Sequence, residues 1–137
     1  MLMLHDLHII NEGGKNILID NGLLHFTWDE AVINKQEALH LHFDNCIAFP
    51  GLINSHDHLD FDLFPQLGNR VYNDYVEWGN DIHAVNKASI NAVLQVPRHL
   101  RVKWGVYKNL LAGVTTVVHH GHYVAEMPEA PIQVFQD

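Results

Sequence analysis

Two histidines separated by one residue, His56 and His58, follow a short apolar segment at residues 49–53. This segment is predicted to be a strand, in which successive side chains point to opposite faces of a sheet. His56 and His58 would then share one face, while Asp57 points to the other. Two imidazoles side by side can hold one divalent metal ion, and Pro50 restricts how the chain enters the strand. We therefore predict a metal site at His56 and His58, the alternative being two polar residues at a strand end.

A second pair with the same spacing, His40 and His42, provides an internal comparison. It lies at residues 38–43, where apolar and polar residues alternate and no Pro-Gly precedes the histidines. Such alternation is typical of a strand with one exposed face. We therefore predict that His40 and His42 lie on the solvent face of a strand and bind no metal.

Residues 1–49 are predicted to form the first domain, a small antiparallel β-sheet. Its short strands, rich in apolar residues, are expected at 2–10, 16–20, 23–27, 38–43 and 46–49. Asn21 and Gly22 join the second and third strands, and this dipeptide is a strong hairpin signal because both positions need a positive φ angle. Asp44 and Asn45 are expected to turn between the last two strands. Residues 28–37 are polar and irregular, with room for a short helical turn.

Residues 50–137 are predicted to form the second domain, in which strands alternate with helices. This alternation is typical of a parallel sheet. After the first strand, helices are expected at 84–95 and 97–113, and further strands at 115–118 and 131–135. Pro97 suits the start of the second helix, and Gly113 suits its end.

One face of the helix at 97–113 is expected to pack on this sheet. Its large apolar residues recur at spacings of four, three and four, which is typical of a buried helix face. These residues are Leu100, Trp104, Tyr107 and Leu111. The basic residues of the same helix are expected to face solvent, namely Arg98, Arg101, Lys103 and Lys108.

The segment that follows the first histidine pair is predicted to be a loop, extended at residues 65–73. Asp60 and Asp62 either orient a metal-bound imidazole or cap and solvate this loop, and the second role is favoured. Tyr75 and Trp78 either line a pocket or anchor the loop, and anchoring is favoured.

A second histidine set, His119, His120 and His122, follows the predicted strand at 115–118. The carboxyl ends of parallel strands lie along one edge of a sheet, and in a (β/α)8 barrel the active site is built there. The two histidine sets are therefore expected on the same edge. The second set is either a polar loop or part of a site. In the latter case we favour His119 or His122 as a hydrogen-bond donor to substrate over a third metal ligand.

Two segments resemble motifs of the amidohydrolase superfamily, and they occur in the order found in that family. Residues 50–58, Pro-Gly-Leu-Ile-Asn-Ser-His-Asp-His, are similar to the metal motif of its first barrel strand. Residues 109–118, Asn-Leu-Leu-Ala-Gly-Val-Thr-Thr-Val-Val, resemble its helix-end glycine and the Thr-Thr strand that follows. The resemblance implies an α/β fold in which a small antiparallel β-sandwich segment precedes the first βα units of a (β/α)8 barrel.

The resemblance also implies a metal-dependent hydrolase that cleaves non-peptide carbon–nitrogen bonds of a small molecule, by hydrolysis or deamination. Its cofactor would be one or two divalent ions, with zinc favoured, which activate water and polarise the bond under attack. His56 and His58 would be ligands through neutral imidazoles. Further ligands and the catalytic base belong to later strands of that family, and such a barrel takes about 250 residues. We therefore expect an N-terminal fragment with an incomplete barrel, inactive alone, whose catalytic residues are unknown.

Two other hypotheses remain open. The chain could be a non-catalytic remnant of the fold that forms homo-oligomers or binds a partner through an exposed sheet edge. It could also be one half of an enzyme assembled from two different chains.

The composition is that of a folded, acidic protein, with 47% hydrophobic residues and a formal net charge of −8. This charge argues against nucleic acid or an anionic membrane surface as a partner. The N-terminus lacks the pattern of a signal peptide, and no apolar segment is long enough to span a membrane. The single cysteine excludes an intrachain disulfide. We therefore expect a cytoplasmic location. The twelve histidines are scattered, which favours specific sites over bulk metal storage.

Overall fold

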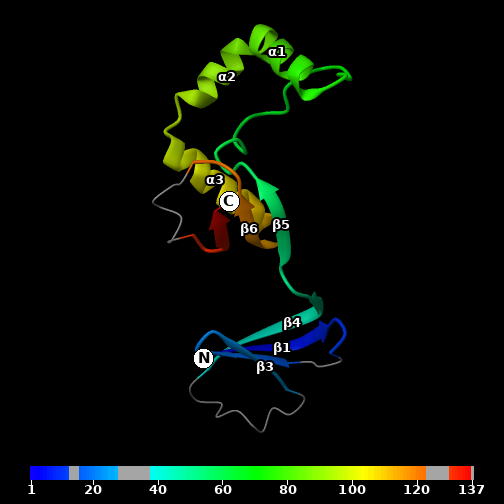
Figure 1. The fold of residues 1–137 in the computed structure, drawn as a ribbon. Coiled ribbons are helices and arrows are strands. Elements are labelled where there is room, and N and C mark those ends of the chain that lie inside the picture. Colours follow the sequence, from blue (N-terminus) through cyan, green and yellow to red (C-terminus); the bar gives the residue numbers. More distant parts are fainter. Residues whose placement is uncertain (13–15, 28–37, 123–129, 137) are drawn as a thin grey trace. The chain divides into compact units, whose positions relative to one another are not determined.

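The computed structural model describes residues 1–12, 16–27, 38–122 and 130–136, and its elements are labelled in Figure 1. The chain divides into two compact units, Met1–Pro50 and Gly51–Asp137. The helical turn considered for residues 28–37 lies outside the described residues.

The first unit is a single four-stranded sheet in its described part. Its strands are β1 (Leu2–Ile9), β2 (Asn16–Asp20), β3 (Leu23–Thr27) and β4 (Leu39–Ala48), arranged in the order β3-β2-β1-β4. β2 and β3 form the predicted hairpin, and both Asn21 and Gly22 have positive φ angles, of 49° and 78°. Leu7, Ile9 and Ile17 form the core of the unit.

The prediction of an entirely antiparallel sheet is wrong, because β4 pairs with β1 in parallel. The connection between β3 and β4 is long enough to carry the chain to the far edge of the sheet, which a parallel neighbour requires. Alternation of apolar and polar residues indicates a strand but not the direction of its partner. The sheet is therefore mixed.

The predicted turn at Asp44 and Asn45 is also wrong, since β4 runs through these residues as one strand. Asn45 has a φ angle of 56°, a left-handed conformation that asparagine tolerates better than most residues. The pairing register shifts between His5 and Leu7 on β1, opposite this part of β4. Asp44 and Asn45, which were predicted to form a turn, therefore lie in a β-bulge within a continuous strand.

The second unit is α/β, as predicted. Its elements are β5 (Leu52–Asp57), α1 (Tyr75–Val85), α2 (Lys87–Leu94), α3 (Arg98–Leu111), β6 (Val114–His119) and β7 (Gln133–Gln136). The three strands form a sheet in the order β5-β6-β7, and both pairings are parallel. The predicted parallel sheet is therefore confirmed. The described residues contain no closed barrel.

Helix α1 was not predicted, although its N-terminus carries a clear signal. The Asp74 side chain accepts a hydrogen bond from the Glu77 backbone N–H at 2.8 Å, which caps the helix. The predicted helix at 84–95 is in fact the end of α1 followed by α2, with a break at Asn86. Of the helices in the described part of the chain, none combines the length and apolar character needed to cross a bilayer.

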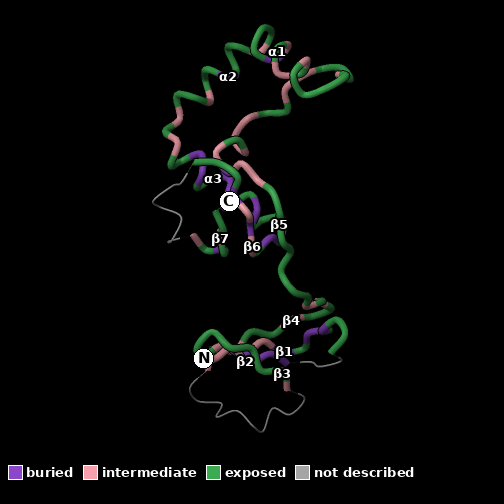
Figure 2. The backbone as a smooth tube through the Cα atoms, in the orientation of Figure 1, coloured by how far each residue is buried: buried purple, intermediate pink, exposed green. Residues whose placement is uncertain are grey.

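The face of α3 that packs on the sheet differs from the predicted face. The buried side is formed by Val102, Gly105, Val106 and Asn109, and the two valines share a core with Val117 of β6. Figure 2 shows these buried segments in purple along α3 and β6. Gly105 accounts for which face of α3 is buried, because it allows the helix backbone to contact the backbone of Leu59.

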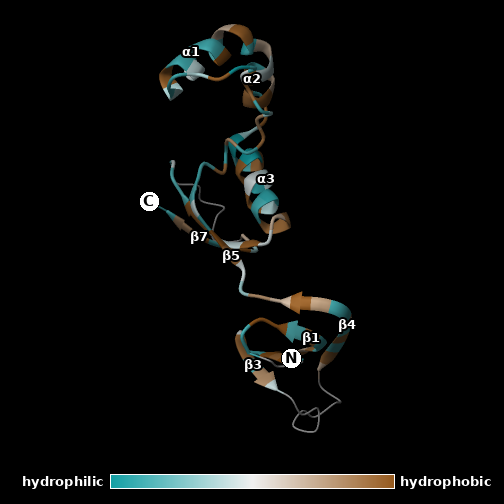
Figure 3. Cartoon of the chain, turned by 90° about the vertical axis from the view of Figure 1, so that its right-hand side faces the viewer, coloured by the Kyte–Doolittle hydropathy of each residue, from teal (hydrophilic) through white to brown (hydrophobic). Residues whose placement is uncertain are grey.

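The predicted apolar face of α3 is exposed instead. Leu100, Trp104 and Tyr107 are 47%, 45% and 44% exposed, and Leu111 is 82% exposed. Hydrophobic and hydrophilic residues alternate along this helix, as Figure 3 shows. Small residues on the buried face of α3 allow it to pack closely. The prediction from spacing alone had instead assigned the largest apolar side chains to that face.

The expectation that all basic residues of α3 face solvent is wrong for Arg101, which is buried, and for Arg98, which is partly buried, whereas Lys103 and Lys108 are exposed as predicted. Arg101 is buried, and its Nη1 donates to the Asp60 carbonyl oxygen at 2.9 Å. Arg98 pairs with the Asp60 carboxylate at 3.1 Å, and Lys108 pairs with the Asp62 carboxylate at 2.6 Å. Both aspartates thus attach the loop after β5 to α3 through ion pairs, whereas the favoured prediction was that they cap or solvate the loop.

Candidate metal centre

The two predicted ligands lie where β5 ends. His56 is the last residue but one of β5, and His58 directly follows the strand. Their ring centres are 5.3 Å apart, so the two side chains lie on the same side of the chain. Asp57 points the other way and accepts a hydrogen bond from the Asn109 side chain of α3 at 2.7 Å. This is the alternation that the strand pattern predicts.

A third imidazole, His120, joins the predicted pair. Its ring centre lies 5.1 Å from that of His56 and 5.3 Å from that of His58. Parallel pairing brings it there, because β6 lies beside β5 and the His120 N–H donates to the Asp57 carbonyl oxygen at 2.7 Å. We call His56, His58 and His120 the histidine cluster.

The histidine cluster offers three imidazoles as possible ligands of a metal ion. Among the described residues, no group of three or more histidine, cysteine, aspartate or glutamate side chains already converges as a ligand set. The separations of the rings nevertheless suit one, because with zinc–nitrogen bonds of about 2.0–2.1 Å the centres of two tetrahedral imidazole ligands lie roughly 5 Å apart. His56 and His120 are exposed, so their side-chain torsions can change without repacking the core. Three imidazoles are donors that zinc accepts, but the His56 and His120 rings are stacked, so they would have to turn to direct one nitrogen each at a single ion.

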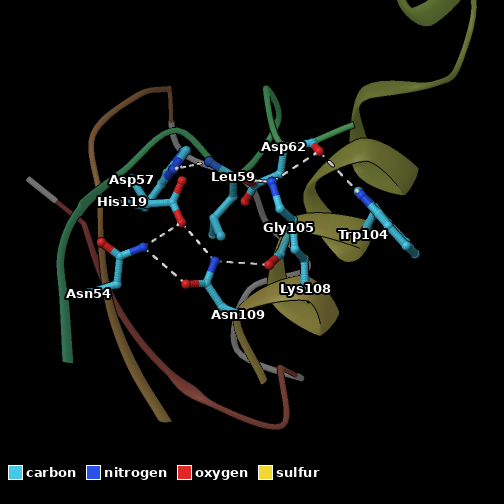
Figure 4. Close-up of polar contacts among 9 residues, drawn as sticks. All are labelled: Asn54, Asp57, Leu59, Asp62, Trp104, Gly105, Lys108, Asn109 and His119. Atoms are coloured by element: carbon cyan, nitrogen blue, oxygen red, sulfur yellow. Dashed lines mark hydrogen bonds and ion pairs between the residues drawn. The ribbon is translucent and has the colours of Figure 1, made fainter. Parts of the chain in front are cut away.

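A network of polar side chains holds the β5 end of the cluster (Figure 4). The Asp57 carboxylate accepts from the Asn54 amide at 2.8 Å and from the Asn109 amide at 2.7 Å. Asn109 also donates to the Gly105 carbonyl oxygen at 3.0 Å, within α3. The residue between the two histidines is thus attached to the helix, which orients the backbone that carries His56 and His58.

His119 and His122, the predicted substrate-binding residues, have different surroundings. His119 is fully buried, and its Nδ1 accepts a hydrogen bond from the Leu59 N–H at 3.3 Å. Burial lowers the pKa of His119, so its imidazole is neutral near pH 7. His122 is exposed, and its carbonyl oxygen accepts from Arg98 at 2.6 Å. The rings that contact one another in the histidine cluster are those of His56, His58 and His120, and the role of His119 and His122 toward a substrate stays a prediction.

The comparison pair, His40 and His42, was expected on the solvent face. His42 is exposed as predicted, whereas His40 is partly buried and its Nδ1 lies 2.7 Å from Nε2 of His5. The His5 ring stacks on both, with centres 5.0 Å and 4.3 Å away. The stacking explains the partial burial of His40, because parallel pairing places His5 beside these residues.

The Asp62 carboxylate, which supports the loop after the histidine cluster, gives a testable pH dependence. Burial raises its pKa, and this effect outweighs the hydrogen bond from Lys108, which lowers it. The folded chain therefore retains the Asp62 proton to a higher pH than the unfolded chain, and ionisation as the pH rises favours unfolding.

We therefore expect Asp62→Asn, which keeps the shape and one oxygen, to gain stability relative to the unsubstituted chain as pH rises from about 4 to neutrality. Urea unfolding of both chains at the two pH values measures the change. If the Asn variant instead loses stability relative to the unsubstituted chain over that range, the ion pair with Lys108 dominates over burial.

No family model matches this chain, and no curated protein matches it either. The resemblance to the amidohydrolase superfamily therefore rests on the two motifs quoted above.

Sequence reasoning missed His120 as a member of the cluster. Three histidines lie at the end of β6 or just after it, and spacing alone does not show which one faces the neighbouring strand. The signal lies in the alternation of the strand. Val117 and His119 are buried on the side of α3, so His120 faces the opposite side.

Proposed function

We propose that this chain contributes the first metal-binding segment of an amidohydrolase-like hydrolase, which cleaves a non-peptide carbon–nitrogen bond of a small molecule. One observation carries the proposal: three imidazoles gather where two adjacent parallel strands end, with ring centres 5.1–5.3 Å apart. This edge of a parallel α/β sheet is where such folds build their active sites. The parallel strands with their helical connection would be the first part of a (β/α)8 barrel.

In this proposal His56 and His58 hold a divalent ion, preferably zinc, and His120 is the third imidazole. When bound, such an ion lowers the pKa of water and polarises the group under attack. Asp57 and Asn109 act indirectly, because they fix the backbone between the two ligands of β5. The amidohydrolase resemblance assigns further ligands and the catalytic base to later barrel strands. Catalysis would thus need residues beyond those of the histidine cluster.

Zinc binding by the purified chain tests the proposal. After exposure to zinc and extensive dialysis against buffer, the chain should retain about one ion, as in other sites with three protein ligands. With cobalt in place of zinc, the visible absorption should be that of a tetrahedral ion. A chain that retains no zinc above the level of a metal-free control protein would exclude the proposed metal site.

A second candidate function, formation of a homo-oligomer, is favoured by the exposed apolar face of α3. Leu100, Trp104 and Tyr107 follow one another at helical spacing and all are more than two-fifths exposed. Such a continuous apolar strip is typical of a surface that contacts another protein. The contact would be between two copies of this chain.

The oligomer is tested by a charge placed in the middle of this face. We expect Trp104→Glu to shift the chain from a dimer to a monomer, because a buried carboxylate without a partner disfavours association. Light scattering coupled to size exclusion gives the mass of each chain, and Lys103→Glu, an exposed change at the neighbouring residue, is the control. If the unsubstituted chain is already a monomer at high concentration, this candidate is excluded.

A further inference from the structure

A cavity of about 560 Å³ lies in the second unit, between the loop after β5 and the helices α1 and α2. Phe61, Phe64 and Leu67 line it from the loop, Trp78 and Ile82 from α1, and Ile90 from α2. Its volume falls within the range of small-molecule sites, which is about 300–1,000 Å³. The cavity is large enough for a substituted aromatic ring or a branched alkyl group.

Hydrogen bonds connect α1 to the loop that forms one wall of the cavity. Trp78 donates from Nε1 to the Leu67 carbonyl oxygen at 3.0 Å, which joins α1 to the loop. Glu77, one residue earlier, accepts from the Asn73 N–H at 3.0 Å and from Arg70 at 2.6 Å. Sites for small molecules are usually preformed in this way.

The lining, in its described part, offers no charged side chain to a ligand. None of the described residues that line the cavity is an aspartate, glutamate, lysine or arginine. His83 and Gln66 are its polar members, and most of the remaining surface is apolar. A charge buried there would lose its hydration without gaining an opposite charge. The cavity therefore suits an uncharged apolar group.

Phe61 connects the cavity to the histidine cluster. It lines the cavity, and its ring stacks on His58 with ring centres 5.3 Å apart and an angle of 17° between the planes. On its other side it contacts Phe64 edge to face, at 5.9 Å. The Phe61 ring thus lies between the cavity and His58, a predicted metal ligand.

We propose that this cavity binds the uncharged apolar part of the substrate, an aryl or branched alkyl group, while the polar part lies at the histidine cluster. The assignment of the polar end rests on the proposed function. The assignment of the apolar end rests on the cavity and is testable without metal.

Filling the cavity from Gly79 of α1 tests the apolar end. Gly79 lines the cavity, and a Cβ atom there would meet nothing within 4 Å, so a side chain can start from this position without a clash at its first atom. The probe is N-phenylnaphthylamine, an uncharged aromatic compound that fluoresces in apolar surroundings. We expect saturable binding to the metal-free chain, weakened about tenfold or more by Gly79→Leu because the side chain occupies the site.

Asn80→Leu is the matched control, because this exposed neighbour on the same helix adds the same side chain outside the cavity lining. Its probe affinity should equal that of the unsubstituted chain. Leu94→Gln provides a second test, which makes the lining more polar without filling the cavity. Leu94 lines the cavity but is 51% exposed, so this substitution should not unfold α2. It should also weaken binding. Absence of saturable binding, or equal binding by Gly79→Leu, overturns the cavity assignment.

The link between cavity and cluster is tested with two hydroxamic acids on the zinc-loaded chain. Phenylbutanohydroxamic acid should bind more tightly than acetohydroxamic acid, and Gly79→Leu should remove the difference. Equal affinities overturn the link. A chain that binds the naphthylamine but no zinc refutes the proposed function and leaves the cavity as a ligand site, whereas zinc retention without probe binding refutes the cavity and leaves the proposed function.

Discussion

Replacing His56 by alanine is expected to abolish zinc binding by the chain, with an affinity loss of at least about a hundredfold. His56 lies in contact with both other rings of the histidine cluster, at 5.3 Å from His58 and 5.1 Å from His120. Its removal would leave two imidazoles, too few for a tight zinc site. Competition with a chromophoric zinc chelator gives the affinity of each variant.

The control for this experiment is His42→Ala. His42 also belongs to a His-x-His pair on a strand and is exposed, and its ring stacks on that of His5. Its removal should leave zinc binding unchanged. Loss of zinc binding by His120→Ala would show that His120 is a third ligand of the ion. If His56→Ala and His42→Ala lose zinc equally, the binding is non-specific and the metal site is not at the end of β5.

Replacing Gly105 by alanine is expected to destabilise the chain by roughly 2 kcal/mol or more, although alanine is the better helix former. A Cβ atom at this position would clash with the Leu59 carbonyl oxygen and lie 2.9 Å from the Leu59 Cα. These are backbone atoms of the segment that directly follows His58, and they cannot rotate away. Either α3 or the loop must move, and urea unfolding measures the cost.

Gly79→Ala is the matched control, because Gly79 is also within a helix and a Cβ atom there would meet nothing within 4 Å. It should stabilise the chain by about 1 kcal/mol, the difference in helix propensity. Both substitutions replace a helical glycine by alanine. If they change the free energy of unfolding in opposite directions, the difference is due to the contact of residue 105 with Leu59. A stability gain from Gly105→Ala would show that α3 does not pack closely on this loop.

Local chemistry alone determined several features of this chain. Asn21 and Gly22 specify a hairpin, because few other residues adopt positive φ angles at both positions. Gly113, with a φ angle of 79°, ends α3 for the same reason. The strand-to-helix alternation after residue 50 predicted the parallel sheet, and the period of a strand placed His56 and His58 on one side with Asp57 on the other.

Only the tertiary structure decided which surfaces meet. The parallel pairing of β4 with β1 depends on where a long connection delivers the strand, which its own residues do not encode. α3 turns Val102 and Val106 inward because Gly105 permits contact with a backbone 46 positions earlier, whereas its larger apolar residues lie outside. His120 joins the histidine cluster through the register of β5 and β6. Long-range packing determines these contacts, because the sequence pattern of one element does not specify the shape of the element beside it.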